Sequence, residues 1–155
     1  MAFKSILSKL LARHVARREA RISLDGIERQ RATLRKLLTM AKDTVFGKEH
    51  GFHSEMSHQD FIKAVPVRDY EALKPWMDRV VAGESNVLWP GMPLYFCKTS
   101  GTTSGAKHIP LSKESMSNHI GSARNALLQF IAETGNASFL EGKMIFLQGS
   151  PILTN

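Results

Sequence analysis

The stretch KTSGTTSGAKHIP, Lys98 to Pro110, places a loop rich in glycine and hydroxyl residues between two short segments that favour β-strands. Residues 94–98 before the loop are apolar and aromatic, and residues 107–111 after it can pair with them as a second strand. Ser112 can then cap a helix that runs to Gly135. No other feature restricts the fold as much, because this order predicts a strand–loop–strand–helix unit.

The run KMIFLQG, residues 143–149, follows that helix and is continuously apolar. Such a run is typical of a strand buried on both faces of a sheet. The expected fold class is therefore α/β, with N-terminal helices followed by strand, loop, strand, helix and strand. Before this unit, hydrophobic periodicity and capping residues predict four helices, over residues 1–22, 26–43, 58–63 and 70–82, and Ser57 is the expected cap of the third.

The charge of the chain is uneven along its length. The formal net charge is +7, but residues 1–50 hold 12 Lys and Arg against 5 Asp and Glu, whereas residues 51–155 hold nine of each. A neutral body without a basic stretch interleaved with aromatic residues argues against nucleic acid as a partner. No apolar run approaches the roughly 20 residues that span a bilayer. The single cysteine, Cys97, excludes an internal disulfide and fits a reducing compartment, so we expect a cytoplasmic protein.

The basic excess coincides with the first predicted helix, whose apolar side chains recur at helical spacing: Phe3, Ile6, Leu7, Leu10, Leu11 and Val15. A helix of this kind can dock on its own domain, lie on a membrane surface, or serve as an organelle-targeting presequence. We expect docking, because the segment leads directly into more helix. In that arrangement Leu7, Leu10 and Leu11 are mostly buried.

Three histidines lie close together after the second helix, and they invite a metal-site interpretation. The spacing of His50, His53 and His58 fits no single helical face, and no cysteine or carboxylate partner is evident. Solvated loop histidines are the expected state. Gly47 and Gly51 are expected to mark the exit of the second helix.

The loop itself has several possible meanings. It is not a Walker A loop, because Gly101 and Gly105 are three residues apart and Ala106 stands before the lysine. Ser104 and Lys107 form a Ser-x-x-Lys pair, but the partner motifs of penicillin-recognising enzymes are absent. A plain hairpin turn needs only one or two special residues. The excess of glycines, hydroxyls and a lysine therefore favours a concave anion site that holds phosphate.

The loop resembles the phosphate-binding signature of adenylate-forming enzymes, TSGTT followed by glycine and lysine between two strands. Wider stretches make the likeness narrower: TVFGKEHGF, VPVRDYEALKPWMDRVVAGESNVLWPG, LYFCKTSGTTSGAKHIPLSKES and RNALLQFIAETGNASFLEGKMIFLQGSP. Together they resemble the Gretchen Hagen three family, the auxin-responsive acyl-acid amido synthetases, and in particular its bacterial members. The resemblance runs from about Thr44 through nearly all of the remaining chain.

This resemblance implies that a small carboxylic acid attacks the α-phosphate of ATP, which gives an acyl-adenylate and pyrophosphate. The amine of an amino acid then displaces AMP to form an amide. ATP and Mg²⁺ are the implied cofactors. On the positions that match the motif, Lys107 is the implied catalytic residue, which neutralises charge on pyrophosphate. The residues implied to line the triphosphate are Thr99, Ser100, Gly101, Thr102, Thr103, Ser104, Gly105 and Lys107.

The resemblance also implies a domain organisation. Residues 1–155 are expected to be a partial N-terminal adenylation domain, with a basic helical segment over 1–45, short helices and loops over 46–93, and an α/β part with the phosphate-binding loop over 94–155. Further nucleotide motifs, the acyl-acid pocket and a smaller C-terminal domain are expected beyond Asn155, so we expect no activity from this chain alone. The alternative is a non-catalytic α/β interaction domain with a basic docking helix.

Overall fold

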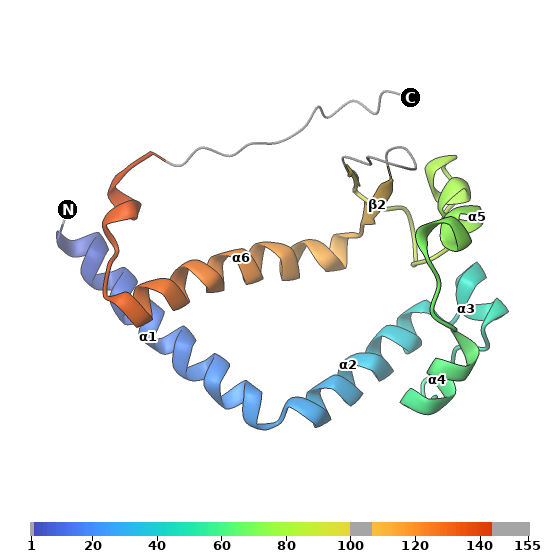
Figure 1. Cartoon of the computed structure of the whole chain (residues 1–155), viewed down its shortest axis with the longest axis horizontal. Helices are drawn as coiled ribbons and strands as arrows, with labels where there is room; N and C mark the ends of the chain where they lie inside the picture. Colours follow the sequence, from blue (N-terminus) through green and yellow to red (C-terminus); the bar gives the residue numbers. More distant parts are fainter. Residues whose placement is uncertain (1, 100–106, 144–155) are drawn as a thin grey trace. The chain divides into compact units, whose positions relative to one another are not determined.

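The computed structural model describes residues 2–99 and 107–143, and these are mostly helical with one small sheet (Figure 1). The elements are α1 (Ala2–Leu24), α2 (Gly26–Ala41), α3 (Val45–Glu49), α4 (His58–Ala64), α5 (Tyr70–Val81), β1 (Tyr95–Lys98), β2 (His108–Leu111), α6 (Lys113–Thr134) and a 3-10 helix, η1 (Ser138–Glu141). The sheet contains β1 and β2. The strand predicted at residues 143–149 lies almost wholly outside the described residues. Among these helices, none has the length and apolar content needed to cross a bilayer.

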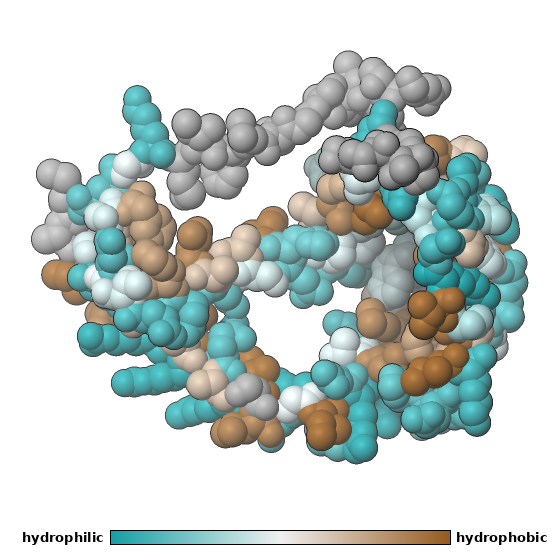
Figure 2. Space-filling view, viewed as in Figure 1, coloured by the Kyte–Doolittle hydropathy of each residue, from teal (hydrophilic) through white to brown (hydrophobic). Residues whose placement is uncertain are grey.

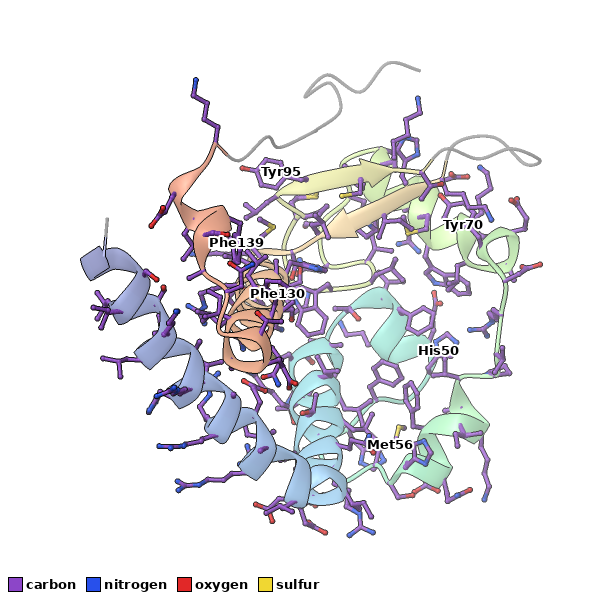
Figure 3. All side chains as sticks on the ribbon, turned by 60° about the vertical axis from the view of Figure 1, so that its left-hand side comes forward. His50, Met56, Tyr70, Tyr95, Phe130 and Phe139 are labelled. Atoms are coloured by element: carbon purple, nitrogen blue, oxygen red, sulfur yellow. The ribbon has the colours of Figure 1, made fainter. Side chains whose placement is uncertain are left out.

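The chain divides into two compact units, residues 1–22 with 121–155, and residues 23–120. The first unit has a small hydrophobic core, which joins α1 to the second half of α6 and the residues that follow it. Phe139 of η1 packs against this core, and its ring meets that of Phe130 edge-on, with centroids 5.9 Å apart (Figure 3). The amide of Asn125 also donates to the Glu19 carboxylate at 3.1 Å. The buried core residues are Ala12, Val15, Leu128, Ile131 and Ala137.

The first helix packs through Ala12 and Val15, so only Val15 is buried among the predicted apolar residues whose side chains the structure describes. Leu7, Leu10 and Leu11 are 56%, 58% and 49% exposed, so the expectation that they are buried is wrong. Ala12 lies two residues after Leu10, which is a rotation of about 200° around the helix, and it is fully buried. Apolar side chains consequently reach the surface in this unit (Figure 2). Periodicity identified the helix correctly, but it did not identify which side of α1 meets α6.

The connection from α2 to α3 is tight. Thr44 is 1% exposed, and its hydroxyl accepts a hydrogen bond from the Gly47 N–H at 2.9 Å while donating to the Ala41 carbonyl at 2.7 Å. Gly47 lies inside α3, so the prediction that it marks a helix exit is wrong. A Cβ at this position would lie 2.0 Å from the Ala41 carbonyl oxygen. Close packing of the backbone is therefore the reason for this glycine, whereas Gly51 follows the helix with a φ of +63°.

Residues 23–120 form the second unit around side chains from α2, α5 and the connecting loops. The first N–H groups of α3 are satisfied by a loop distant in sequence. Val45 N–H donates to the Asn86 carbonyl and Phe46 N–H to the Val87 carbonyl, both at 2.9 Å. The buried apolar residues of this unit are Leu38, Ala41, Met56, Met77, Val80 and Val87.

Two predicted helix starts are confirmed by their capping bonds. Ser57 and Asp60 form a reciprocal capping box at the start of α4, with the Asp60 N–H donating to the Ser57 hydroxyl at 3.2 Å. The Ser112 hydroxyl accepts from the Ser115 N–H at 3.2 Å at the start of α6. This last helix ends before Gly135, whose φ of +67° is the left-handed conformation that commonly ends a helix.

Candidate functional site

The hairpin around the predicted phosphate loop is present. β1 and β2 pair antiparallel in a register that places Lys98 opposite His108. One position further, the Thr99 N–H donates to the Lys107 carbonyl at 3.0 Å, and the Lys107 N–H is 3.4 Å from the Thr99 hydroxyl oxygen. The two ends of the loop are therefore joined directly.

Two of the eight predicted site residues lie in the described structure, and it brings them together at the base of the hairpin. They are Thr99, which is exposed, and Lys107, which is half-buried. The other six lie outside the described residues, and their role stays a prediction: Ser100, Gly101, Thr102, Thr103, Ser104 and Gly105.

The Lys107 ammonium contacts an aromatic ring. Its Nζ lies 5.2 Å from the centroid of the Tyr70 ring, within the range of a cation–π interaction. None of the ion pairs formed by residues 2–99 and 107–143 includes Lys107. An ammonium group held by a ring retains its full charge, and no carboxylate among those residues neutralises it. It can therefore bind an anion at the mouth of the loop.

Tyr70 comes from the start of α5. The Asp69 carboxylate caps this helix by accepting the Ala72 N–H at 2.8 Å. The hydroxyl of Tyr70 accepts a hydrogen bond from the His108 N–H at 3.0 Å. Figure 3 shows Tyr70 at the beginning of α5, beside the end of the hairpin from which the loop leaves.

A cluster of aromatic and charged side chains attaches α5 to α3. The Arg68 guanidinium lies 5.4 Å from the centroid of the Trp76 ring and 6.0 Å from that of Phe46, and it is 3.1 Å from His50 Nε2. His50 stacks on Phe46 with centroids 3.9 Å apart. The Trp76 indole N–H donates to Glu49 at 2.7 Å. The prediction that His50 is a solvated loop histidine is therefore wrong.

The partners of His50 determine its tautomer. Nδ1 lies 2.8 Å from the Phe46 carbonyl, which only accepts, while Nε2 faces Arg68, which only donates. The proton consequently belongs on Nδ1. A sequence signal was available, because Phe46 and His50 are four residues apart and such residues are neighbours on a helix. Recognising α3 as a helix was the missing step.

An apolar hollow of about 210 Å³ lies beside the hairpin, between the 87–93 loop, β2 and the start of α6. Its two serines, Ser112 and Ser115, are already bonded to each other in the helix cap. At its edge the Trp89 indole N–H donates to Glu114 at 3.1 Å. The backbone N–H of Glu114, together with Trp89 and Ser112, holds the pKa of that carboxyl below its ordinary value. The hollow offers shape and apolar surface but no free reactive group.

The donors at the hairpin fit an anion better than a bare metal ion. In the part of the chain that the structure describes, no group of three or more His, Cys, Asp or Glu side chains could hold a metal. The hairpin base offers the Lys107 ammonium and the Thr99 hydroxyl instead.

Comparison with known proteins agrees with the motif resemblance. Residues 20–150 match the GH3 family N-terminal domain. The chain belongs to the GH3 family. The matched range contains α2 to α6, the hairpin and Tyr70, so all described residues of the candidate site lie within the GH3 domain.

Three curated relatives of this GH3 chain come from Arabidopsis thaliana. Indole-3-acetic acid-amido synthetase GH3.3 is 29% identical over 81 residues, which are 52% of this chain and 14% of that protein. Indole-3-acetic acid-amido synthetases GH3.5 and GH3.6 are 26% and 27% identical over 81 residues, which are 52% of this chain and 13% of each protein. The match thus spans about one seventh of the length of the relatives.

Sequence reasoning missed Tyr70 and Arg68 as parts of the site. Both lie in the VPVRDY segment, which was interpreted only as a break before a helix. The available signal was an aspartate cap followed at once by an aromatic residue. That pattern predicts that Tyr70 is the first residue of a helix. It does not predict the contact of the Tyr70 ring with Lys107, which lies 37 positions further along the chain.

Proposed function

We propose that this GH3 chain carries the phosphate-binding segment of an ATP-dependent acyl-acid amido synthetase. In the proposed reaction, a carboxylate oxygen of the acid attacks the α-phosphorus of ATP, and pyrophosphate leaves. The amine of an amino acid then attacks the acyl carbon, AMP leaves, and the amine loses a proton. The names of the Arabidopsis relatives support an acid and an amine as substrates.

The observation that carries this proposal is the hairpin base within a GH3 domain, where Thr99 and Lys107 meet and no described carboxylate neutralises the lysine. In the proposed site, Lys107 neutralises charge on the β- and γ-phosphates as pyrophosphate departs. Backbone N–H groups and hydroxyls from Thr99 to Gly105 surround the phosphate oxygens. Mg²⁺, when bound with ATP, supplies further neutralisation of the leaving group.

The type of GH3 protein, its location in the cell and the roles of its segments are also proposals. The quoted motifs favour a bacterial-type GH3 protein that acts in the cytoplasm, as the N-terminal part of its adenylation domain. Within it we propose a basic helical segment over residues 1–45, a support region of short helices over 46–93, and the nucleotide-binding part over 94–155.

Binding of ATP to the 155-residue chain tests the proposal. We expect weak, millimolar-range binding, seen as saturable NMR shifts of the Thr99 and Lys107 amides, with AMP binding more weakly than ATP. Lys107→Ala should weaken ATP binding. Lys113→Ala is the matched control, because it removes an exposed lysine of the same charge from the other end of β2. Equal losses from both variants, or no ATP-dependent shift at this hairpin, would contradict a phosphate-binding role.

A second function is favoured by one observation, the exposure of Leu7, Leu10 and Leu11 on the basic α1. A helix with exposed aliphatic groups beside arginines can dock on an anionic surface. The alternative is thus a non-catalytic interaction domain. Co-sedimentation with anionic vesicles decides between the two, with neutral vesicles as the control. Salt-sensitive binding that is lost in Leu10→Ser would support docking, while absence of binding would remove this alternative.

A further inference from the structure

We propose that Tyr70 is the positioning residue of the phosphate site: it fixes the outer edge of β2 through its hydroxyl and holds the Lys107 ammonium on its ring. The inference rests on the proposed function of the loop as a triphosphate site. Both contacts are within one compact unit, residues 23–120. The hydroxyl of Tyr70 therefore acts on β2, and its ring acts on Lys107.

The hydroxyl completes the edge of the hairpin. In an antiparallel pair, N–H groups alternate between the partner strand and the outer edge. The bond from Thr99 to Lys107 makes that pair a bonded one, so the next pair, Lys98 with His108, directs the His108 N–H outward. Tyr70 accepts this N–H at 3.0 Å. The following outward position of β2 is Pro110, which has no N–H.

The ring restricts the lysine. A lysine side chain has four rotatable bonds, and it loses considerable rotamer freedom when it binds an anion. With Nζ 5.2 Å from the Tyr70 centroid, part of that ordering already exists before a ligand arrives. Preorganisation of this kind raises affinity because less freedom is lost on binding. The ring leaves the positive charge of Lys107 unneutralised, so an anion still gains the full electrostatic attraction.

Tyr70 is itself well anchored, which a positioning residue requires. It is the first residue of α5, fixed by the Asp69 cap. Met77 lies seven residues later, about two turns along the helix, and is buried on the same face. Two residues before Tyr70, Arg68 contacts the rings of Phe46 and Trp76. The position of Lys107 is thereby linked to the core through α5.

Two variants separate the tasks. Tyr70→Phe keeps the ring and removes the hydroxyl, whereas Tyr70→Leu removes both and keeps an apolar side chain, with circular dichroism to check that each variant folds. In the wild type, the ε-methylene protons of Lys107 should show an upfield ring-current shift. This shift should persist in Tyr70→Phe and disappear in Tyr70→Leu. Exchange of the His108 amide proton should accelerate in both variants, by about 2–10-fold.

Binding of inorganic tripolyphosphate links this geometry to function. Tyr70→Leu should lower its affinity by about 2–5-fold, while Tyr70→Phe should stay within about twofold of the wild type. Adding Tyr70→Leu to Lys107→Ala should cause no further loss, because the ring acts through the lysine.

The possible failures are distinguishable. Wild-type protein that binds no tripolyphosphate overturns the proposed function, and the ring-current and exchange measurements still decide the positioning. Wild-type protein that binds it, together with unchanged affinity and an unchanged Lys107 shift in Tyr70→Leu, overturns the role of Tyr70. Additive losses in the double variant would also overturn it, since they would show that Tyr70 acts independently of Lys107.

Discussion

At the scale of single residues, the junction between α2 and α3 depends on the absence of a side chain at Gly47. A Cβ there would lie 2.0 Å from the Ala41 carbonyl oxygen, and that oxygen is backbone, fixed by its bond to the buried Thr44 hydroxyl. Overpacking commonly costs about 1–3 kcal/mol, and a backbone clash belongs at or above the upper end. We expect Gly47→Ala to lower the free energy of unfolding in urea by about 3 kcal/mol or more.

The matched control is Gly26→Ala, at the first position of α2, where no atom lies within 4 Å of an added Cβ. Alanine favours the helix over glycine, so this variant should be neutral or more stable by up to about 1 kcal/mol. Similar destabilisation by both changes would mean that loss of glycine flexibility, and not the clash, determines the effect at Gly47.

A second residue-scale prediction concerns Asp60 in the capping box of α4. Hydrogen bonds from the Ser57 hydroxyl and then from the Ser57 backbone N–H lower the pKa of Asp60 below its ordinary value. A lowered folded-state pKa means that the carboxylate contributes stability above the unfolded-state pKa. This contribution is lost as the pH falls through the folded-state pKa, so acidification below about pH 4 should loosen the start of α4.

NMR titration of the Asp60 carboxyl carbon measures this effect directly. Ser57→Ala should raise the pKa of Asp60 toward that of an unfolded peptide, and Ser57→Thr should keep it low because the hydroxyl is retained. An Asp60 titration that is identical in wild type and Ser57→Ala would show that the capping box does not persist in solution.

At the scale of elements, the sequence predicted those parts whose signals are local. The hairpin, the Ser112 cap of α6 and the Ser57 cap of α4 depend on residues within a few positions of one another, and all were confirmed. The helix α3 was missed because its five residues are too few to show a hydrophobic period. The packed face of α1 was predicted wrongly for Leu7, Leu10 and Leu11 and correctly for Val15, since a helix with apolar residues on several sides does not reveal which side meets its partner.

The observed packing of α1 on α6 yields a direct test. Ile131 is 2% exposed in the core formed with Ala12, whereas Leu10 is 58% exposed. Ile131→Ala should therefore lower the free energy of unfolding by about 2–5 kcal/mol. Leu10→Ala should change it by less than about 0.5 kcal/mol. Urea unfolding monitored by circular dichroism compares the two, and a loss from Leu10→Ala equal to that from Ile131→Ala would restore the original prediction.

At the scale of the whole molecule, the described part of the candidate site belongs to one of the two compact units, residues 23–120. The sequence motif predicts that Thr99 and Lys107 are site residues, and the structure brings the two together. The motif did not indicate Tyr70 as a site residue, because its contacts with residues far along the chain depend on how α5 packs against the hairpin. The family resemblance was confirmed through the GH3 domain match, while adenylation and the residues from Ser100 to Gly105 stay proposals.

The last prediction concerns catalysis in the full-length GH3 protein that we propose. Lys107→Ala removes a preorganised positive charge where negative charge develops on pyrophosphate. Loss of one such group commonly lowers kcat by roughly 10²–10³. Acid-dependent exchange of pyrophosphate into ATP should fall by about that factor, while the free energy of unfolding should change little because Lys107 forms no ion pair among the described residues. Lys113→Ala, with the same loss of charge, should leave exchange near the wild-type rate.

If Lys107→Ala and Thr102→Ala both retain wild-type exchange, the loop does not take part in adenylation. If the 155-residue chain alone catalyses acid-dependent exchange, the site is complete without the rest of a GH3 enzyme.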